Sequence, residues 1–177
     1  YNRVFWLAYL ANLTMVGANA LTFPFAELVS FLGGSQKTTG VIVQVGMLGA
    51  LGSRIFLGQL LDRYGTRRIW LAGACMFGAS AIGFLLSEST GWPIYVSRMA
   101  FAIGVAAIST AAIVHIQNQV PRQRRTEVIG NFGSSGFIGM VLGSQAGDLV
   151  FWFYPESPLR YQILFGAAFL LAGLYAW

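Results

Sequence analysis

The sequence has 177 residues, of which 10% are charged and 56% are hydrophobic, and its mean hydropathy is +0.64. Because a typical soluble domain has about 25% charged and 45–50% apolar residues, this composition excludes an ordinary soluble domain and a disordered chain. The net charge of +5 does not indicate nucleic-acid binding, since the arginines lie between long uncharged segments and not on one polar face. The expected partner is the lipid bilayer, with no nucleic acid.

Six apolar segments follow one another along the chain, each close to the length of about 20 residues that crosses a bilayer as a helix. The predicted helices cover residues 4–29, 38–61, 67–87, 93–118, 127–153 and 160–177. Glycine, proline and serine occupy the breaks between them, as at helix ends. The polar and apolar alternation of membrane β-strands is absent. The sequence therefore predicts an all-α polytopic membrane protein, with residues 1–177 forming one six-helix transmembrane bundle.

The basic residues are divided unequally between the two sides of the membrane. If the first residue is on the inner side, the inner segments contain Arg3, Arg63, Arg67, Arg68, Arg122, Arg124 and Arg125. The outer loops contain Lys37 and Arg160. Because cytoplasmic loops carry an excess of basic residues, we expect a multi-pass protein with a cytoplasmic N-terminus, in a bacterial inner (plasma) membrane.

The loop between the second and third predicted helices contains a spaced motif of small and charged residues. Its members are Gly58, Asp62, Arg63, Gly65, Arg67 and Arg68. A basic inner loop explains the arginines, but not an acidic residue at a helix end followed three residues later by glycine. We expect Gly65 to permit a tight reversal and Gly58 to permit close approach of a neighbouring helix. The segment resembles the G-x-L-x-D-R-x-G-x-R-R signature of the major facilitator superfamily (MFS), in the same loop.

Two other segments resemble motifs of that family in part. Arg98 to Gly104 is similar to an R-x-x-x-G motif, although the glycine comes two residues late. Gly139, Gly143 and Gly147 recur at four-residue steps, similar to a glycine-rich helix of many members. Glycines at this spacing are also expected in a close helix–helix contact.

The resemblance implies a secondary active transporter of a small molecule or ion that works by alternating access. Members have two six-helix halves, each of two three-helix repeats, and this chain resembles the N-terminal half. The chain begins at Tyr1 and ends in an apolar segment, so we expect it to be part of a longer protein with a C-terminal six-helix half as partner. The loop motif would act as a gate that contacts this second half.

Polar residues inside the predicted helices are candidates for substrate contacts, because such residues are costly in a bilayer. The substrate-binding candidates are Arg54, Asn12, Asn19 and Gln145. Arg54 lies about 12 Å from the inner helix end by helix rise, without an acid predicted at that depth, which favours an anionic substrate. The alternatives are snorkelling of Arg54 and interhelical hydrogen bonds for the amides.

Arg98 and Asp148 are predicted at similar depths in antiparallel helices. We expect them to form an intramembrane ion pair, and the alternative is a proton-coupling role for Asp148. Cys75 lies in an apolar run and is expected to be inert packing.

Two other functions are compatible with six spans. Gly133 to Gly136 matches the G-x-S-G motif of intramembrane serine proteases, but the single histidine, His115, precedes Ser135, which disfavours an enzyme. The chain could also be a non-transporting membrane partner protein. No phosphate-binding loop, metal-ligand cluster or dinucleotide fingerprint is present, so we expect no cofactor and no metal.

Overall fold

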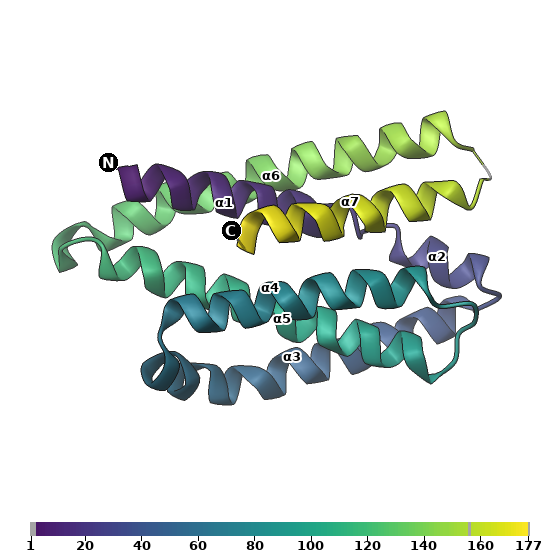
Figure 1. Ribbon diagram of the computed structural model, residues 1–177, viewed down its shortest axis with the longest axis horizontal. Coiled ribbons are helices and arrows are strands. Elements are labelled where there is room, and N and C mark those ends of the chain that lie inside the picture. The colour runs from purple at the N-terminus through teal and green to yellow at the C-terminus, as the bar shows by residue number, and fades with distance from the viewer. Residues whose placement is uncertain (1–2, 156, 177) are drawn as a thin grey trace.

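The computed structural model describes residues 3–155 and 157–176, and over these residues it is all-α. The helices are α1 (Arg3–Ala20), α2 (Phe25–Phe31), α3 (Gln36–Tyr64), α4 (Thr66–Leu85), α5 (Trp92–Asn118), the short 3₁₀ turn η1 (Arg122–Arg124), α6 (Arg125–Phe153) and α7 (Leu159–Ala176). They lie roughly side by side along the long axis of the molecule (Figure 1). Five spans in the described part of the chain are long and apolar enough to cross a membrane, and Leu159–Leu174 is a shorter apolar helix.

The first span differs from the predicted continuous helix over residues 4–29. A turn at residues 21–24 separates α1 from α2, and Pro24 stands at the start of α2. Proline lacks a backbone N–H and disfavours helical geometry in the residue before it, so it breaks the helix here. The Thr22 hydroxyl donates to the Asn19 carbonyl oxygen at 2.7 Å and satisfies part of the interrupted backbone.

The helices pack in the order α3, α5, α4, α7, α1, α6 (Figure 1). Helices α3 and α6 lie at the two ends of this order and are the least buried spans. If the chain is divided into two three-helix repeats, the first repeat contains the spans α1–α2, α3 and α4, and the second contains α5, α6 and α7. The pairs α3–α5 and α6–α1 are then equivalent, because each joins the first span of one repeat to the second span of the other. The main core lies between α4, α5 and α7 and the end of the first span, around Phe77, Phe84 and Phe165.

Glycines allow two of the helix pairs to approach closely. On α4 and α5, a Cβ atom at Gly104 would lie 2.8 Å from the Gly73 carbonyl oxygen. On α1 and α6, a Cβ atom at Gly143 would lie 2.9 Å from the Gly17 Cα, and one at Gly139 would collide with the Leu13 carbonyl oxygen. Gly139 and Gly143, the first two of the three regularly spaced glycines, therefore form a close contact with α1. A Cβ atom at Gly147, the third, would meet nothing within 4 Å in the described chain.

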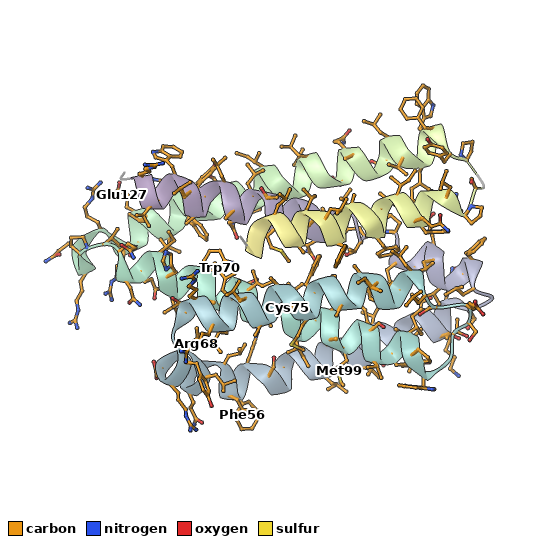
Figure 2. The ribbon with its side chains drawn as sticks, viewed as in Figure 1. Phe56, Arg68, Trp70, Cys75, Met99 and Glu127 are labelled. Carbon is orange, nitrogen blue, oxygen red and sulfur yellow. The ribbon has the colours of Figure 1, made fainter. Side chains whose placement is uncertain are left out.

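Cys75 corrects one expectation. Its side chain is exposed on α4 in the described chain (Figure 2), whereas we expected it to be inert packing. One side of α4 packs on the core and the other is exposed, but both sides are hydrophobic, as expected of a helix in a bilayer. Hydrophobicity alone therefore could not predict the side on which Cys75 lies.

Candidate functional site

Arg54 lies on the rim of a cavity between α3 and α5. The cavity has a volume of about 590 Å³ and is lined by Arg54, Leu57, Gly58, Ser109, Thr110, Ile113, Val114 and Gln117. Arg54 is exposed, and no carboxylate of the described residues lies within salt-bridge distance of it. The hydroxyls of Ser109 and Thr110 donate to backbone carbonyls four residues earlier, so their oxygens keep lone pairs that can accept hydrogen bonds.

Sequence inspection missed the polar residues of α5 that share this cavity. Ser109, Thr110 and Gln117 lie on one side of the helix, because seven or eight residues correspond to about two turns. The signal was present as this spacing. This signal is weak, because single serines and threonines in membrane helices commonly bond their own backbone.

The two candidate asparagines of α1 have different surroundings. The Asn12 amide donates to the Ser135 hydroxyl oxygen on α6 at 2.8 Å, which is the interhelical hydrogen bond considered as an alternative. Asn19 lines a separate cavity together with Arg98, and no residue of the described chain hydrogen-bonds its side chain. Gln145 is exposed on α6 and lines neither cavity.

Arg98 and Asp148 are not brought together. The Arg98 guanidinium lies 4.5 Å from the ring centre of Phe25 and 4.8 Å from that of Phe101. Asp148 is exposed on α6, and within residues 3–155 and 157–176 it forms no salt bridge with Arg98. The equal depth that the sequence implies is not sufficient, since α5 and α6 contact each other only slightly.

The loop motif forms the junction of α3 and α4. Gly65 has φ +78° and ends α3, so the expected tight reversal is present. Asp62, Arg63, Arg67 and Arg68 are exposed and form no salt bridge among the described residues. A Cβ atom at Gly58 would meet nothing within 4 Å, so the neighbouring helix that we expected there does not come from this part of the chain.

The basic residues of the three inner segments lie at one end of the bundle. The start of α1, the α3–α4 junction and η1 are found together at the left of Figure 1, whereas Lys37 and Arg160 lie in the first turns of α3 and α7, which begin at the opposite end. Figure 2 shows Arg68 and Glu127 at the left end. The structure thus keeps the charge asymmetry on which the predicted orientation depends.

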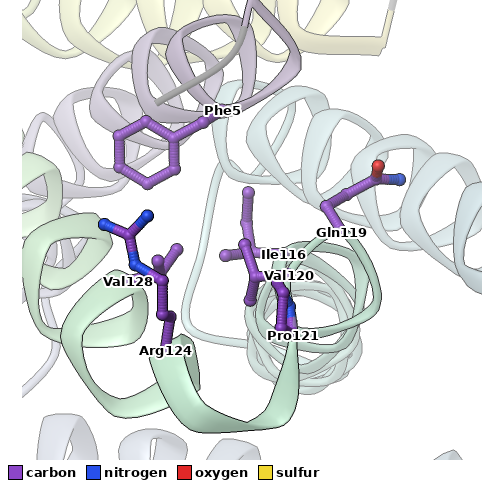
Figure 3. Close-up of a pocket in the computed structure, with 7 residues that line it drawn as sticks. All are labelled: Phe5, Ile116, Gln119, Val120, Pro121, Arg124 and Val128. Atoms are coloured by element: carbon purple, nitrogen blue, oxygen red, sulfur yellow. The ribbon is translucent and has the colours of Figure 1, made fainter.

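A smaller cavity of about 170 Å³ lies at this basic end (Figure 3). It is lined by Phe5, Ile116, Gln119, Val120, Pro121, Arg124 and Val128. Arg124 pairs with Glu127 at 3.0 Å, so its charge is balanced within the protein. None of the sequence-predicted site residues lies in this cavity.

The residues of the protease-like motif are engaged in packing. Ser135 is fully buried, accepts the hydrogen bond of Asn12 and donates to the Phe132 carbonyl oxygen at 2.6 Å. The His115 ring instead packs edge-on against Trp70, with ring centres 5.9 Å apart. Among the described residues, no base is therefore placed to activate Ser135.

Comparison with known proteins agrees with the resemblance of the loop motif to the MFS signature. The family profile described as Major Facilitator Superfamily matches residues 5–177. The chain is 29% identical to an uncharacterized MFS-type transporter, YfiU, of Bacillus subtilis over 124 residues, which is 64% of this chain and 24% of the relative. It is 27% identical to the multidrug resistance protein MdtL of Shewanella oneidensis (77% of this chain, 34% of the relative) and to a D-xylose transporter of Levilactobacillus brevis (58% and 22%).

The chain thus matches between about a fifth and a third of the length of these curated relatives. The profile, in contrast, covers almost all of the chain, and the loop motif, the all-α fold and the apolar spans agree with it. The chain is therefore a multi-pass, non-enzymatic membrane protein, and it belongs to the Major Facilitator Superfamily.

Proposed function

We propose that this chain is the N-terminal half of a secondary active transporter that moves a small anionic solute by alternating access. The observation that carries the anionic preference is Arg54, a cation on a cavity of about 590 Å³ without a carboxylate partner in the described chain. A charged residue at membrane depth requires a partner, and a negatively charged solute supplies one. The Gln117 amide can donate a hydrogen bond to the anionic group, whereas the Ser109 and Thr110 hydroxyls, which already donate to backbone carbonyls, can accept from N–H or O–H groups elsewhere on the solute.

The names of the relatives do not select one solute. One is called a multidrug resistance protein and another a D-xylose transporter, at nearly equal identity to this chain. The proposal of an anion therefore depends on Arg54 and its surroundings and not on the relatives.

The proposed partner is a second six-helix half that covers the side of α3 facing away from α5. Met47, Leu48, Leu51 and Ile55 are exposed on α3, and Cβ atoms at Gly52 and Gly58 would meet nothing within 4 Å. A small residue is favoured where another helix approaches closely. The relatives are also three to five times longer than their matched segments, which leaves room for such a half.

The gating role proposed for the loop motif follows from the same arrangement. Asp62, Arg63, Arg67 and Arg68 are exposed and without salt bridges in the described chain, at the end of α3 next to the proposed contact surface. Ion pairs between this loop and the second half would hold the inner end closed, and their loss would open it.

Uptake by proteoliposomes that contain the full-length protein tests the transport proposal. We would compare nitrate, benzoate, D-xylose and a cationic amphiphile, in wild type and in Arg54→Ala. We expect anion uptake in wild type and a decrease of about tenfold or more in Arg54→Ala, because a charge-assisted hydrogen bond contributes about 1.5–3 kcal/mol. Arg122→Ala is the matched control, since it removes an arginine that lies outside this cavity. Equal anion uptake by wild type and Arg54→Ala would overturn the anion-site proposal.

The second half is tested on the full-length reading frame. We expect a downstream block of six further apolar spans. A frame that ends without them would contradict the proposed twelve-helix arrangement and would favour a non-transporting partner protein or a dimer of halves.

A further inference from the structure

Arg98 is a second cation at membrane depth that lacks a charged partner in the described chain. It lies on α5, two turns from the outer end, and it is partly buried. No carboxylate is within salt-bridge distance of it, and no hydrogen-bond acceptor is found for its N–H groups among residues 3–155 and 157–176. Its side chain is therefore held in place without its charge being neutralised.

Packing explains how Arg98 is held. The guanidinium contacts the rings of Phe25 on α2 and Phe101 on α5, and such cation–π contacts contribute about 0.5–2 kcal/mol. Gly46 on α3 leaves room for the side chain, since a Cβ atom there would lie 3.0 Å from the Arg98 Cγ. The rings hold the cation but do not accept its hydrogen bonds in the way that a carboxylate does, so its N–H donors remain available.

A cavity of about 330 Å³ lies next to this cation. It is lined by Asn19, Thr22, Phe23, Phe25, Arg98 and Phe101. The Asn19 amide is a second donor without a partner in the described chain, whereas the Thr22 hydroxyl already donates to a backbone carbonyl. The remaining lining is aromatic. Two unpaired donors beside aromatic side chains match a ligand that combines a carboxylate with a flat apolar ring.

The cavity is separate from the one at Arg54. Arg98 and Thr110, which lines the Arg54 cavity, are twelve residues apart on α5, or about 18 Å by helix rise.

We propose that the Arg98 cavity is an outer subsite for a small aromatic carboxylate, with the carboxylate bound by the Arg98 and Asn19 side chains. The proposal rests on the transport function proposed above, because it adds a second anion-binding site to the same pathway. A bidentate bond between guanidinium and carboxylate is the strongest pairing available to these groups. An acidic partner from the protein is not required, since the ligand itself supplies the negative charge.

Equilibrium binding of benzoate to the purified full-length protein, measured by calorimetry, tests this subsite. We expect wild type to bind benzoate and Arg98→Gln to bind it about ten- to a hundredfold more weakly. Asn19→Asp provides a second variant, because it retains Arg98 and its aromatic contacts but places a carboxylate beside the cation, and we expect it to abolish benzoate binding. The neutral isostere benzamide is expected to bind weakly to all variants.

Asn118→Asp is the matched control, since it makes the same change of charge at an exposed position at the end of α5. It is expected to bind benzoate as wild type does. Unchanged benzoate affinity in both Arg98→Gln and Asn19→Asp would overturn the subsite, as would a loss of affinity that occurs only in Arg54→Gln.

The two proposals fail in different ways. Anion uptake that depends on Arg54, together with benzoate binding that is insensitive to Arg98→Gln and Asn19→Asp, would overturn the subsite and retain the transport function. Benzoate binding that depends on Arg98, without uptake of any tested solute, would overturn the transport function and retain a carboxylate site.

Discussion

Replacement of Gly104 by alanine should separate α4 from α5. The added Cβ atom would lie 2.8 Å from the Gly73 carbonyl oxygen and 2.9 Å from the Phe77 backbone nitrogen. Both are backbone atoms of a neighbouring helix, so neither can rotate away. An ordinary contact requires about 3.5 Å, and the two helices must therefore move apart by about 0.7 Å.

The cost follows from the contacts that this movement weakens. A gap of 0.5–1 Å loses about a quarter to a half of the attraction of each atom pair, which is about 0.1–0.2 kcal/mol. Loss at about 20 pairs around the fully buried Phe77 amounts to roughly 1 kcal/mol. Side-chain strain adds to this, so we expect a total of about 1–3 kcal/mol.

Thermal unfolding of the full-length protein in detergent, followed by tryptophan fluorescence, measures the effect. The midpoint of Gly104→Ala should fall by roughly 1–2 °C for each kcal/mol, because the entropy of unfolding grows with chain length and the full-length protein is proposed to be at least twice as long as this chain. Gly166→Ala on α7 is the control, because its Cβ atom would meet nothing within 4 Å, and its midpoint should stay the same or rise slightly. A midpoint for Gly104→Ala equal to that of wild type would refute the close contact of α4 and α5.

Three further variants test other features by the same measurement. Ser135→Ala removes the acceptor of the Asn12 amide and should destabilise the protein by about 0.6–2 kcal/mol, the range of interhelical hydrogen bonds in membranes. Gly65→Ala forces a side chain into a backbone conformation with φ +78° and ψ 162° and should cost about 1–3 kcal/mol. Glu127→Gln breaks an exposed ion pair with Arg124, and the free energy of unfolding should change by less than about 1 kcal/mol.

Matched variants separate these effects from general damage. Ser144→Ala removes a hydroxyl that, among the described residues, bonds only its own helix, and it should change stability less than Ser135→Ala. Gly40→Ala adds a methyl group in open space at a helical position, so it should not reproduce the loss at Gly65. Equal losses in Gly65→Ala and Gly40→Ala would contradict the role assigned to the positive φ angle. A loss above about 2 kcal/mol in Glu127→Gln would mean that its pair with Arg124 is not an ordinary surface pair.

The sequence predicted the all-α fold well because the bilayer imposes a strong rule. A segment of about 20 apolar residues must satisfy its backbone internally, so its helical state follows from composition alone. The break at Pro24 was missed, since a short turn inside a long apolar segment leaves that segment as apolar as an unbroken helix would be. The turn at Gly65 was predicted because a glycine between charged residues at a helix end is typical of a tight reversal.

The candidate site was predicted less completely. Arg54 was predicted as a candidate because a charge in an apolar segment is conspicuous, but the α5 residues around its cavity were not. The ion pair of Arg98 and Asp148 was predicted from the depth of each residue in the membrane, which can be counted along the sequence. The lateral order of the helices decides whether two residues of equal depth meet, and periodicity does not contain that order.

The hydrogen bond between Asn12 and Ser135 also has a consequence for biosynthesis. The two residues are separated by 123 positions, so the acceptor is synthesised about 6–25 s after the donor at a ribosomal rate of 5–20 residues per second. During this interval α1 lies in the membrane without the helix against which it packs. Its amide must be accommodated by water, lipid headgroups or an insertion factor until α6 arrives. Variants that slow synthesis between α1 and α6 should therefore expose the first span to degradation more than variants that slow it elsewhere.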